Sequence, residues 1–284
     1  MSLGKVTCCA GYELLATGAG QRLERWNGIV VQRPESAADW PWKNPELPTW
    51  QGFYDGRRAM GGRWHWLTPL PDPCIVRHGS LSFLIRETGS KHLGLFPEQA
   101  ANWDWIHQII SNSIKRPNPI KVLNLFGYTG GSTLAAASAG AHVTHVDSAR
   151  AMVDWCSENA RLSGLKSAPI RYIVEDAVKY LQREIRRGNR YDAVIMDPPS
   201  FGRGKGGELW KLIEQLPELI NSAHQALTDS PLFMLLNTYS DLTQDPRLLI
   251  SMSLGGHCDE VSLGLCGSLD QQWIPCGKSY RWEK

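Results

Sequence analysis

The chain has 284 residues, of which 42% are hydrophobic and 20% are charged, and its formal net charge is +2. A chain of this size is expected to form one large core, or a core with a smaller domain. It has no apolar run long enough to span a membrane and no basic-then-apolar signal pattern at its start, so we expect a cytoplasmic protein without membrane contact. The low net charge excludes a broadly basic surface, and any nucleic-acid partner must be bound by a local patch.

The N-terminal part is rich in tryptophan, proline and short strand patterns. Eight of the twelve tryptophans precede Ile106, and they are interpreted mainly as packing residues rather than as a platform for stacked bases. Turn residues separate strand-like runs at 27–33, 63–67, 74–79 and 81–87. This pattern predicts a small antiparallel β region. We therefore place a β-rich accessory or substrate domain at residues 1–105.

From residue 119 onward, apolar runs alternate with segments of helical character. The runs occupy 120–126, 141–147, 170–176, 191–197 and 232–237, and Gly140, Gly164 and Gly188 stand where helices should stop. Such alternation predicts a mostly parallel, doubly wound α/β sheet over residues 106–284, with helices on both faces. The tail 259–284 reads as two strands with a turn between them, which predicts an antiparallel hairpin at one sheet edge.

The seven cysteines are odd in number and include no C-x-x-C spacing. Such a set is not a disulfide framework or a metal-ligand pattern. We expect reduced thiols and no metal.

A glycine turn follows the first apolar run of this second part, in the stretch VLNLFGYTGGST at 122–133. It has no lysine of a phosphate loop, and Thr129 stands where a dinucleotide fold requires its second glycine. Glycines allow a ligand close to the backbone, and a helix starting near Ser132 offers free N–H groups to an anion. The pattern favours an amino-acid carboxylate, although a tight strand-to-helix connection without a ligand would look the same.

Acidic residues end the next three runs: Asp147, then Glu175 with Asp176, then Asp197. Each of them alone is commonly a helix cap or a solvated loop end. In an open parallel sheet, however, the carboxyl ends of all strands face one crevice, so these acids should converge. A ligand with amino-acid, ribose and adenine parts would use the turn for its carboxylate, Asp147 for its ribose hydroxyls and Asp176 for its adenine amino group.

The stretch MDPPSFGRGKGG at 196–207 leaves the fourth run at the same edge. Its prolines present carbonyl oxygens without competing N–H donors, and Asp197 adds an acceptor, which suits an amine or a ring nitrogen. Phe201 would stack on a flat substrate, while Arg203 and Lys205 would close on phosphates. The alternative is a rigid turn with Phe201 in the core, followed by a plain glycine-rich surface loop.

These features resemble the class I S-adenosylmethionine-dependent methyltransferases. The turn NLFGYTGG departs from the usual form of that class, because Asn124 stands where the class has an acidic residue. In this respect the turn is similar to that of the bacterial large-subunit ribosomal RNA methyltransferases that make 5-methylcytidine or 7-methylguanosine. Three more stretches look like that group: VDSARAMVDWCSENARLSGL, MDPPSFGRG and KHLGLFPEQAANWDWI. The resemblance implies a Rossmann-like methyltransferase fold of seven strands with a reversed last strand.

The resemblance also implies a cofactor, S-adenosylmethionine, with S-adenosylhomocysteine as its product, and an RNA partner. It implies cofactor contacts by Asn124, Phe126, Gly127, Tyr128, Thr129, Gly130, Asp147, Ser148, Ala149, Glu175 and Asp176, and by Phe96 and Gln99 ahead of the sheet. It implies catalytic roles for Asp197, Pro198, Pro199 and Phe201, and substrate contacts by Arg203 and Lys205.

The predicted acceptor is a nucleobase nitrogen. Methylation of cytosine carbon 5 requires a cysteine nucleophile. In the resembling enzymes this cysteine follows the fourth or fifth strand, and here neither 197–200 nor 237–240 contains one. The N-terminal β region also leaves no room for the added RNA-binding domain of the resembling enzymes, and the arginines at 183, 186, 187 and 190 are interpreted as a solvated helix end. Alternatives are a methyltransferase acting on protein or small molecules, a nicotinamide-dependent oxidoreductase, and a non-catalytic module that binds RNA or protein. The edge hairpin and the tryptophan-rich domain would also allow self-association.

Overall fold

The computed structural model describes residues 2–3, 9–56, 61–113, 118–203 and 209–284. The chain divides into two compact units. Unit 1 consists of Met1–Gly4, Asn102–Leu263 and Gly277–Lys284, and unit 2 of Lys5–Ala101 and Gly264–Cys276. The composition predicts a single domain boundary after residue 105. In the structure, unit 2 also includes Gly264–Cys276, because the last two strands of the chain contribute residues to both units. The predicted role of unit 2 as a substrate domain stays a prediction.

Unit 1 contains the doubly wound sheet, in the strand order β1-β16-β17-β15-β12-β9-β10-β11. The neighbours from β15 to β11 pair in parallel, and β17 pairs antiparallel with β15. The predicted seven-stranded, mostly parallel sheet with a reversed last strand is confirmed, and a two-residue strand, β1, adds to its edge. The strands are β1 (Ser2–Leu3), β9 (Lys121–Leu125), β10 (His142–Asp147), β11 (Ile170–Val174), β12 (Ala193–Met196), β15 (Phe233–Thr238), β16 (Cys258–Cys266) and β17 (Trp273–Glu283).

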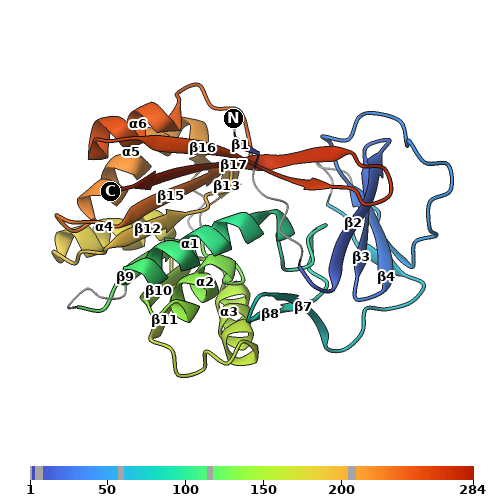
Figure 1. Ribbon diagram of the computed structural model, residues 1–284, viewed down its shortest axis with the longest axis horizontal. Coiled ribbons are helices and arrows are strands. Elements are labelled where there is room, and N and C mark those ends of the chain that lie inside the picture. Colours follow the sequence, from blue (N-terminus) through green and yellow to red (C-terminus); the bar gives the residue numbers. More distant parts are fainter. Residues whose placement is uncertain (1, 4–8, 57–60, 114–117, 204–208) are drawn as a thin grey trace. The chain divides into compact units, whose positions relative to one another are not determined.

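Helices cover both faces of this sheet (Figure 1), with α1, α2 and α3 on one side and α4, α5 and α6 on the other. They are α1 (Ala100–Asn112), α2 (Gly131–Ser138), α3 (Arg150–Leu162), α4 (Ala177–Arg186), α5 (Leu212–Gln225) and α6 (Pro246–Leu254). Gly140, Gly164 and Gly188 have φ values of 90°, 73° and 71° just past α2, α3 and α4. The left-handed backbone ends each helix where the sequence predicts it.

The core of unit 1 follows from this layering. Leu123, Leu125 and Met196 on one sheet face pack with apolar residues of α4, α5 and α6. On the other face Trp105 of α1 packs edge-on against Phe233, with ring centroids 5.1 Å apart. A parallel sheet covered on both faces buries nearly every strand residue, which explains the continuous apolar runs in the sequence. The sheet is therefore a rigid support whose carboxyl edge positions the loops that follow the strands.

One local prediction is wrong. Residues 207–227 have helical character in the sequence, with a kink or break expected at Pro217, but the structure places Leu209–Lys211 in a short strand, β14, paired antiparallel with β13 (Phe201–Arg203). The Trp210 indole lies 5.6 Å from the Phe126 ring and donates to the Pro199 carbonyl oxygen at 2.6 Å. These tertiary contacts override helix propensity over one turn, and α5 begins only at Leu212.

Unit 2 is β-rich, as predicted. It contains a five-stranded sheet, β2-β3-β4-β5-β6, and a hairpin, β7-β8. All pairs are antiparallel except β4 with β5. The strands are β2 (Tyr12–Gly18), β3 (Gln21–Trp26), β4 (Ile29–Pro34), β5 (Gly52–Tyr54), β6 (Trp64–Trp66), β7 (Cys74–His78) and β8 (Leu81–Ile85). Across the described ranges of both units, no helix has the length and apolarity to cross a membrane.

Candidate functional site

The carboxyl ends of four neighbouring strands, β12, β9, β10 and β11, form one rim in unit 1. Three backbone hydrogen bonds join the segments that follow these strands. Gly127 N–H donates to Val146 O at 2.9 Å, Glu175 N–H to Asp147 O at 3.0 Å, and Asp197 N–H to Leu125 O at 3.3 Å. The structure therefore brings together the glycine turn and the acidic residues that the sequence assigns to one crevice.

The glycine turn is packed tightly against the elements beneath it. Phe126, Tyr128 and Gly130 take left-handed φ values of 57°, 48° and 95°. A Cβ on Gly127 would lie 2.5 Å from the His145 ring, and one on Gly130 would lie 2.2 Å from Cys156 Sγ. Since real Cβ contacts of that length do not occur, both positions require glycine for close approach.

Helix α2 begins directly after the turn with free backbone donors. Its N-cap residue, Gly130, has no side chain to cap the helix. Among the described residues, no acceptor is paired with the N–H groups of Gly131, Ser132 and Thr133. Unpaired N–H groups and the positive end of the helix dipole favour an anion at this place. A ligand carboxylate fits these donors.

Asp147 ends β10 and holds the turn. Its Oδ2 accepts from Tyr128 N–H at 2.9 Å and its Oδ1 from Ala149 N–H at 2.9 Å. Burial raises the pKa of this carboxyl above its ordinary value of 3.8, and the backbone N–H groups of Ala149, Tyr128 and Ser148 oppose that rise. Each carboxylate oxygen can accept a second hydrogen bond, so Asp147 has acceptors left for sugar hydroxyls. Ser148 and Ala149 form the exposed connection to α3.

The acids after β11 are engaged locally. Glu175 is paired with Arg183, with N–O distances of 2.6 Å. Asp176 is the N-cap of α4, and its Oδ1 accepts from Lys179 N–H at 2.9 Å. Within the described part of the chain no group donates to the other oxygen of Asp176. The helix-cap interpretation of Asp176 therefore holds, while its contact with an adenine amino group, and that of Glu175 with a cofactor, stay predictions.

A buried polar network lies under the turn. Asn124 Nδ2 donates to Thr133 Oγ1 at 2.8 Å, and that hydroxyl lies 2.8 Å from His145 Nδ1. Burial lowers the pKa of His145 to about 4, so the ring is neutral near pH 7. Asn159 Nδ2 also donates to Thr129 O at 2.9 Å. The network supports the turn from below, and direct contact of Asn124 with a cofactor stays a prediction.

Sequence reasoning missed three members of this network: Thr133, His145 and Asn159. The available signal was a polar residue inside an otherwise apolar strand or helix face, as with His145 in β10. A buried polar group must be hydrogen-bonded, so such a position indicates a specific partner nearby.

The stretch after β12 forms a second group of acceptors. Tyr239 Oη donates to Asp197 Oδ1 at 2.6 Å. The carbonyl of Pro199 is occupied by the Trp210 indole, but the carbonyl of Pro198 accepts no hydrogen bond from any described residue. Of the two proline carbonyls, that of Pro198 is thus unpaired among the described residues, and Pro198 itself is buried. Tyr239 and Trp210 were not predicted, and Tyr239 could have been found because it follows β15 at the same rim.

The remaining predicted site residues are placed as follows. Phe201 is 59% exposed on β13, so it is not a core residue and its ring is accessible. The backbone of Arg203 belongs to β13, whereas its side chain and the whole of Lys205 lie outside the described residues. Phe96 and Gln99 belong to unit 2, where Phe96 precedes the turn η1 (Pro97–Gln99). Their contacts with a cofactor or substrate stay predictions.

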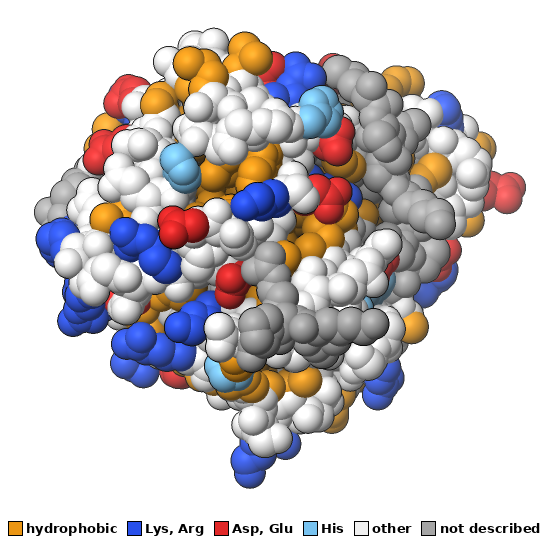
Figure 2. Space-filling view, turned by 60° about the vertical axis from the view of Figure 1, so that its left-hand side comes forward, with side chains coloured by type: hydrophobic (Ala, Val, Ile, Leu, Met, Phe, Trp, Pro, Cys, Tyr) orange, Lys and Arg blue, Asp and Glu red, His pale blue; other side chains and the backbone are white. Residues whose placement is uncertain are grey.

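Charge on unit 1 is mixed rather than uniformly basic. In Figure 2, Lys and Arg side chains are most numerous at the lower left of the face in view, but others are scattered over that face, and acidic and hydrophobic side chains lie among them. The arginines of α4 are partly neutralised, because Arg183 pairs with Glu175 and Arg187 lies 3.5 Å from the Glu184 carboxylate. No cluster of His, Cys, Asp and Glu suited to a metal ion is found among the described residues.

A family model described as S-adenosylmethionine-dependent methyltransferase matches residues 56–229 of the chain. The protein belongs to this family. A solved S-adenosylmethionine-dependent methyltransferase from Agrobacterium tumefaciens is 35% identical, with a TM-score of 0.87 over 96% of this chain and 90% of that one. The cofactor of this family, S-adenosylmethionine, has the carboxylate and ribose hydroxyls that the α2 donors and Asp147 suit.

Curated relatives include ribosomal RNA methyltransferases. Ribosomal RNA large subunit methyltransferase I of Aeromonas salmonicida is 29% identical over 152 residues, 53% of this chain and 36% of that protein. Ribosomal RNA large subunit methyltransferase K/L of Syntrophotalea carbinolica is 30% identical over 172 residues, 60% of this chain and 23% of that protein. The match thus spans about a quarter to a third of the length of these relatives.

Proposed function

We propose that this methyltransferase transfers a methyl group to a nitrogen of a nucleobase in RNA, with ribosomal RNA as the favoured substrate. The observation that carries the nitrogen assignment is the pair of acceptors after β12, the Asp197 carboxylate and the free Pro198 carbonyl. The naming of the relatives as ribosomal RNA methyltransferases supports the choice of RNA.

The cofactor would be held by groups of the rim. S-adenosylmethionine supplies an electrophilic methyl group on a sulfonium. The N–H groups at the start of α2 bind its carboxylate, and Asp147 accepts hydrogen bonds from its ribose hydroxyls. The free oxygen of Asp176 accepts from its adenine amino group. Asn124, Thr133 and His145 keep the turn in the shape that this binding requires.

The acceptor base would be held at the Asp197 end. An amino group of the base donates to the Asp197 carboxylate and the Pro198 carbonyl, which directs its lone pair at the methyl group. After transfer the nitrogen releases one proton, which the Asp197 carboxylate accepts, and S-adenosylhomocysteine is the leaving group. The hydrogen bond from Tyr239 restrains the carboxylate, and the exposed ring of Phe201 stacks on the base. A fixed negative charge beside the nitrogen also stabilises the positive charge that develops there during transfer. Positioning of the two reactants supplies the rest of the acceleration.

The cysteine positions argue against carbon methylation. No cysteine stands at 197–200 or 237–240, after β12 and β15. Cys156 lies under the turn, where it is fully buried and burial raises the pKa of its thiol, so it cannot act as a thiolate nucleophile. Without a nucleophile to activate carbon 5 of a pyrimidine, a nitrogen lone pair is the better acceptor.

Transfer of labelled methyl from S-adenosylmethionine onto total RNA and total protein, taken from a strain that lacks this protein, tests the proposal. We expect label in RNA, and nucleoside analysis should place it on a base nitrogen. Label confined to protein or to small molecules would overturn the RNA substrate. Label on a base carbon would keep RNA but overturn the nitrogen assignment.

A further inference from the structure

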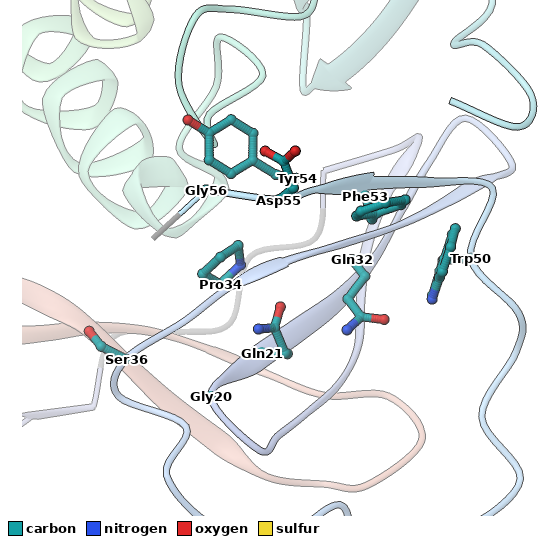
Figure 3. Close-up of a pocket in the computed structure, with 10 residues that line it drawn as sticks. All are labelled: Gly20, Gln21, Gln32, Pro34, Ser36, Trp50, Phe53, Tyr54, Asp55 and Gly56. Atoms are coloured by element: carbon teal, nitrogen blue, oxygen red, sulfur yellow. The ribbon is translucent and has the colours of Figure 1, made fainter. Parts of the chain in front are cut away.

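Unit 2 contains a pocket of its own (Figure 3). Its volume is about 470 Å³, within the range of small-molecule sites. The described residues that line it are Gly20, Gln21, Gln32, Pro34, Ser36, Trp50, Phe53, Tyr54, Asp55 and Gly56. Figure 3 shows Trp50 and Phe53 toward one end, Pro34 toward the other, and the two glutamines between them. The pocket is formed by β3, β4 and β5 and by residues beside these strands.

Aromatic rings form one wall of this pocket. The rings of Trp50 and Phe53 have centroids 4.7 Å apart and are tilted by 57°. His65 stacks on the Phe53 ring at 4.7 Å with an interplanar angle of 11°, and its Nε2 lies 2.5 Å from Asp55 Oδ2. Asp55 thus orients His65, and His65 fixes Phe53. The wall is a preorganised aromatic surface rather than a set of freely rotating side chains.

Two side-chain amides on this side of the sheet have no hydrogen-bond partner among the residues that the structure describes. Gln32 is opposite Phe53 in the β4–β5 register, and Gln21 is on β3. Both are partly buried, and neither amide makes a hydrogen bond to another described residue. By contrast, Gln51 Oε1 accepts from Val30 N–H at 2.6 Å. Each free amide offers a donor and an acceptor, so the pocket can pair with a ligand edge that carries both.

The composition of the pocket selects a class of ligand. A purely apolar ligand would cover the two amides and leave them unpaired, which is costly. A sugar phosphate would not use the aromatic wall. A flat heterocycle with donors and acceptors along its edge uses both the aromatic rings and the amides.

We propose that unit 2 binds an unpaired nucleobase of the RNA substrate in this pocket, with the base against Trp50 and Phe53 and its polar edge at Gln21 and Gln32. This inference rests on the proposed function, because the proposed RNA substrate supplies the nucleobase. The base it holds is distinct from the methylated base, because that base is positioned by Asp197 in unit 1. A second anchored base would give the enzyme sequence preference on single-stranded RNA.

Calorimetric titration of the full chain without cofactor tests the pocket directly. The probes are a single-stranded ribohexamer of mixed sequence, each of the four nucleoside monophosphates, and ribose 5-phosphate. We expect the hexamer and at least one nucleotide to bind, and ribose 5-phosphate to show no binding. The Phe53→Leu change should weaken hexamer binding by about fivefold or more, since base–aromatic stacking is lost. Gln32→Leu should weaken it too and should change the ranking of the four nucleotides.

Controls keep this test independent of folding and of turnover. Leu67→Ala, at a side chain of unit 2 that is 71% exposed, should leave hexamer binding unchanged. Affinity for S-adenosylhomocysteine should be equal in all variants. Equal hexamer affinity in wild type, Phe53→Leu and Gln32→Leu would overturn the proposal that this pocket binds a nucleobase. The absence of binding by every probe would overturn it as well. Binding of nucleotides but not of the hexamer would reject RNA as the source. A failure of methyl transfer to RNA would refute the proposed function without changing these titrations.

Discussion

The phenol of Tyr239 donates a hydrogen bond to the Asp197 carboxylate, with 2.6 Å between the two oxygens. The two residues follow β15 and β12, which are neighbours in the sheet. The parallel pairing of these strands therefore places a donor beside the carboxylate at the rim. A carboxylate held in this way is ready to receive a substrate N–H without first losing rotational freedom.

Asp197 and Tyr239 should affect turnover and leave cofactor binding intact. We expect Asp197→Ala to lower kcat by about 100-fold or more, because a fixed charge at the reacting nitrogen is removed. Tyr239→Phe should lower it by about tenfold, since the carboxylate remains but loses its restraint. Single-turnover methyl transfer and titration with S-adenosylhomocysteine measure the two effects separately. Equal loss of turnover and of cofactor affinity in Asp197→Ala would assign Asp197 to the cofactor site.

Gly127 should be intolerant of a side chain. An alanine there would place Cβ 2.5 Å from the His145 ring, so the turn or the ring must move. Forced repacking of this kind costs about 1–3 kcal/mol, and we expect that loss in the binding of S-adenosylhomocysteine. Gly89→Ala is the matched control, because a Cβ there meets no atom within 4 Å. Unchanged affinity in Gly127→Ala would show that the cofactor does not depend on this turn.

Cofactor binding should weaken in acid through Asp147. Burial raises the pKa of Asp147 above 3.8, and only the ionised carboxylate accepts from both ribose hydroxyls. Affinity for S-adenosylhomocysteine should therefore fall as the pH drops through that raised pKa, and should be constant above it. Asp147→Asn should lower affinity at neutral pH by about tenfold to 100-fold and remove this pH dependence. Asp154→Asn, at an exposed residue of α3, should keep the wild-type pH profile.

Stability of unit 2 should depend on Glu24. Its carboxylate accepts from Arg33 at 2.6 and 2.9 Å and from Tyr12 at 2.9 Å. Burial raises the pKa of Glu24, but Arg33 and Arg22 outweigh it and hold that pKa at about 2. The folded-state pKa is below the ordinary 4.5, so this stabilisation is present above pH 4.5 and is lost as the pH falls toward 2.

Glu24→Gln should lower the free energy of unfolding by about 3–5 kcal/mol, because the buried Arg33 loses its carboxylate partner and Arg22 keeps only Glu35. Glu13→Gln is the matched control on the neighbouring strand. Its ion pair with Arg25 is partly exposed and should contribute only about 0–1 kcal/mol. Denaturant unfolding near pH 7 measures both variants. A loss of similar size in the two variants would contradict the account of the buried network.

The doubly wound sheet could be predicted because its strands are buried on both faces. That burial produces nearly continuous apolar runs, and the glycines and acids that follow the strands are conspicuous against them. Strands β2 and β3 could not be predicted in the same way. In β3 the pattern is masked by two buried charges, Arg22 and Glu24, which pair with each other. Glu24 also pairs with Arg33 of the adjacent β4, and Arg22 with Glu35. Such compensation depends on neighbouring strands and leaves no local pattern.

The sequence predicts which residues lie at the rim of the site, but not the hydrogen-bond partners of those residues. Asp147 and Asp197 could be placed because parallel strands share a carboxyl edge. The capture of the Pro199 carbonyl by Trp210 depends on how a loop folds back, which the spacing of residues does not encode. Tyr239 follows β15 at the same rim, but the sequence does not show that its hydroxyl donates to Asp197. The helix cap at Asp176, by contrast, could be predicted, because a segment of helical character follows it directly.

A crystal structure of the protein with S-adenosylhomocysteine tests the central claim most directly. The account predicts the ligand carboxylate at the N–H groups that begin α2, its ribose hydroxyls on Asp147, and its sulfur facing Asp197 across the rim. A nucleoside bound elsewhere, for example in the aromatic pocket of unit 2, or bound with Asp147 turned away from the ribose, would contradict it.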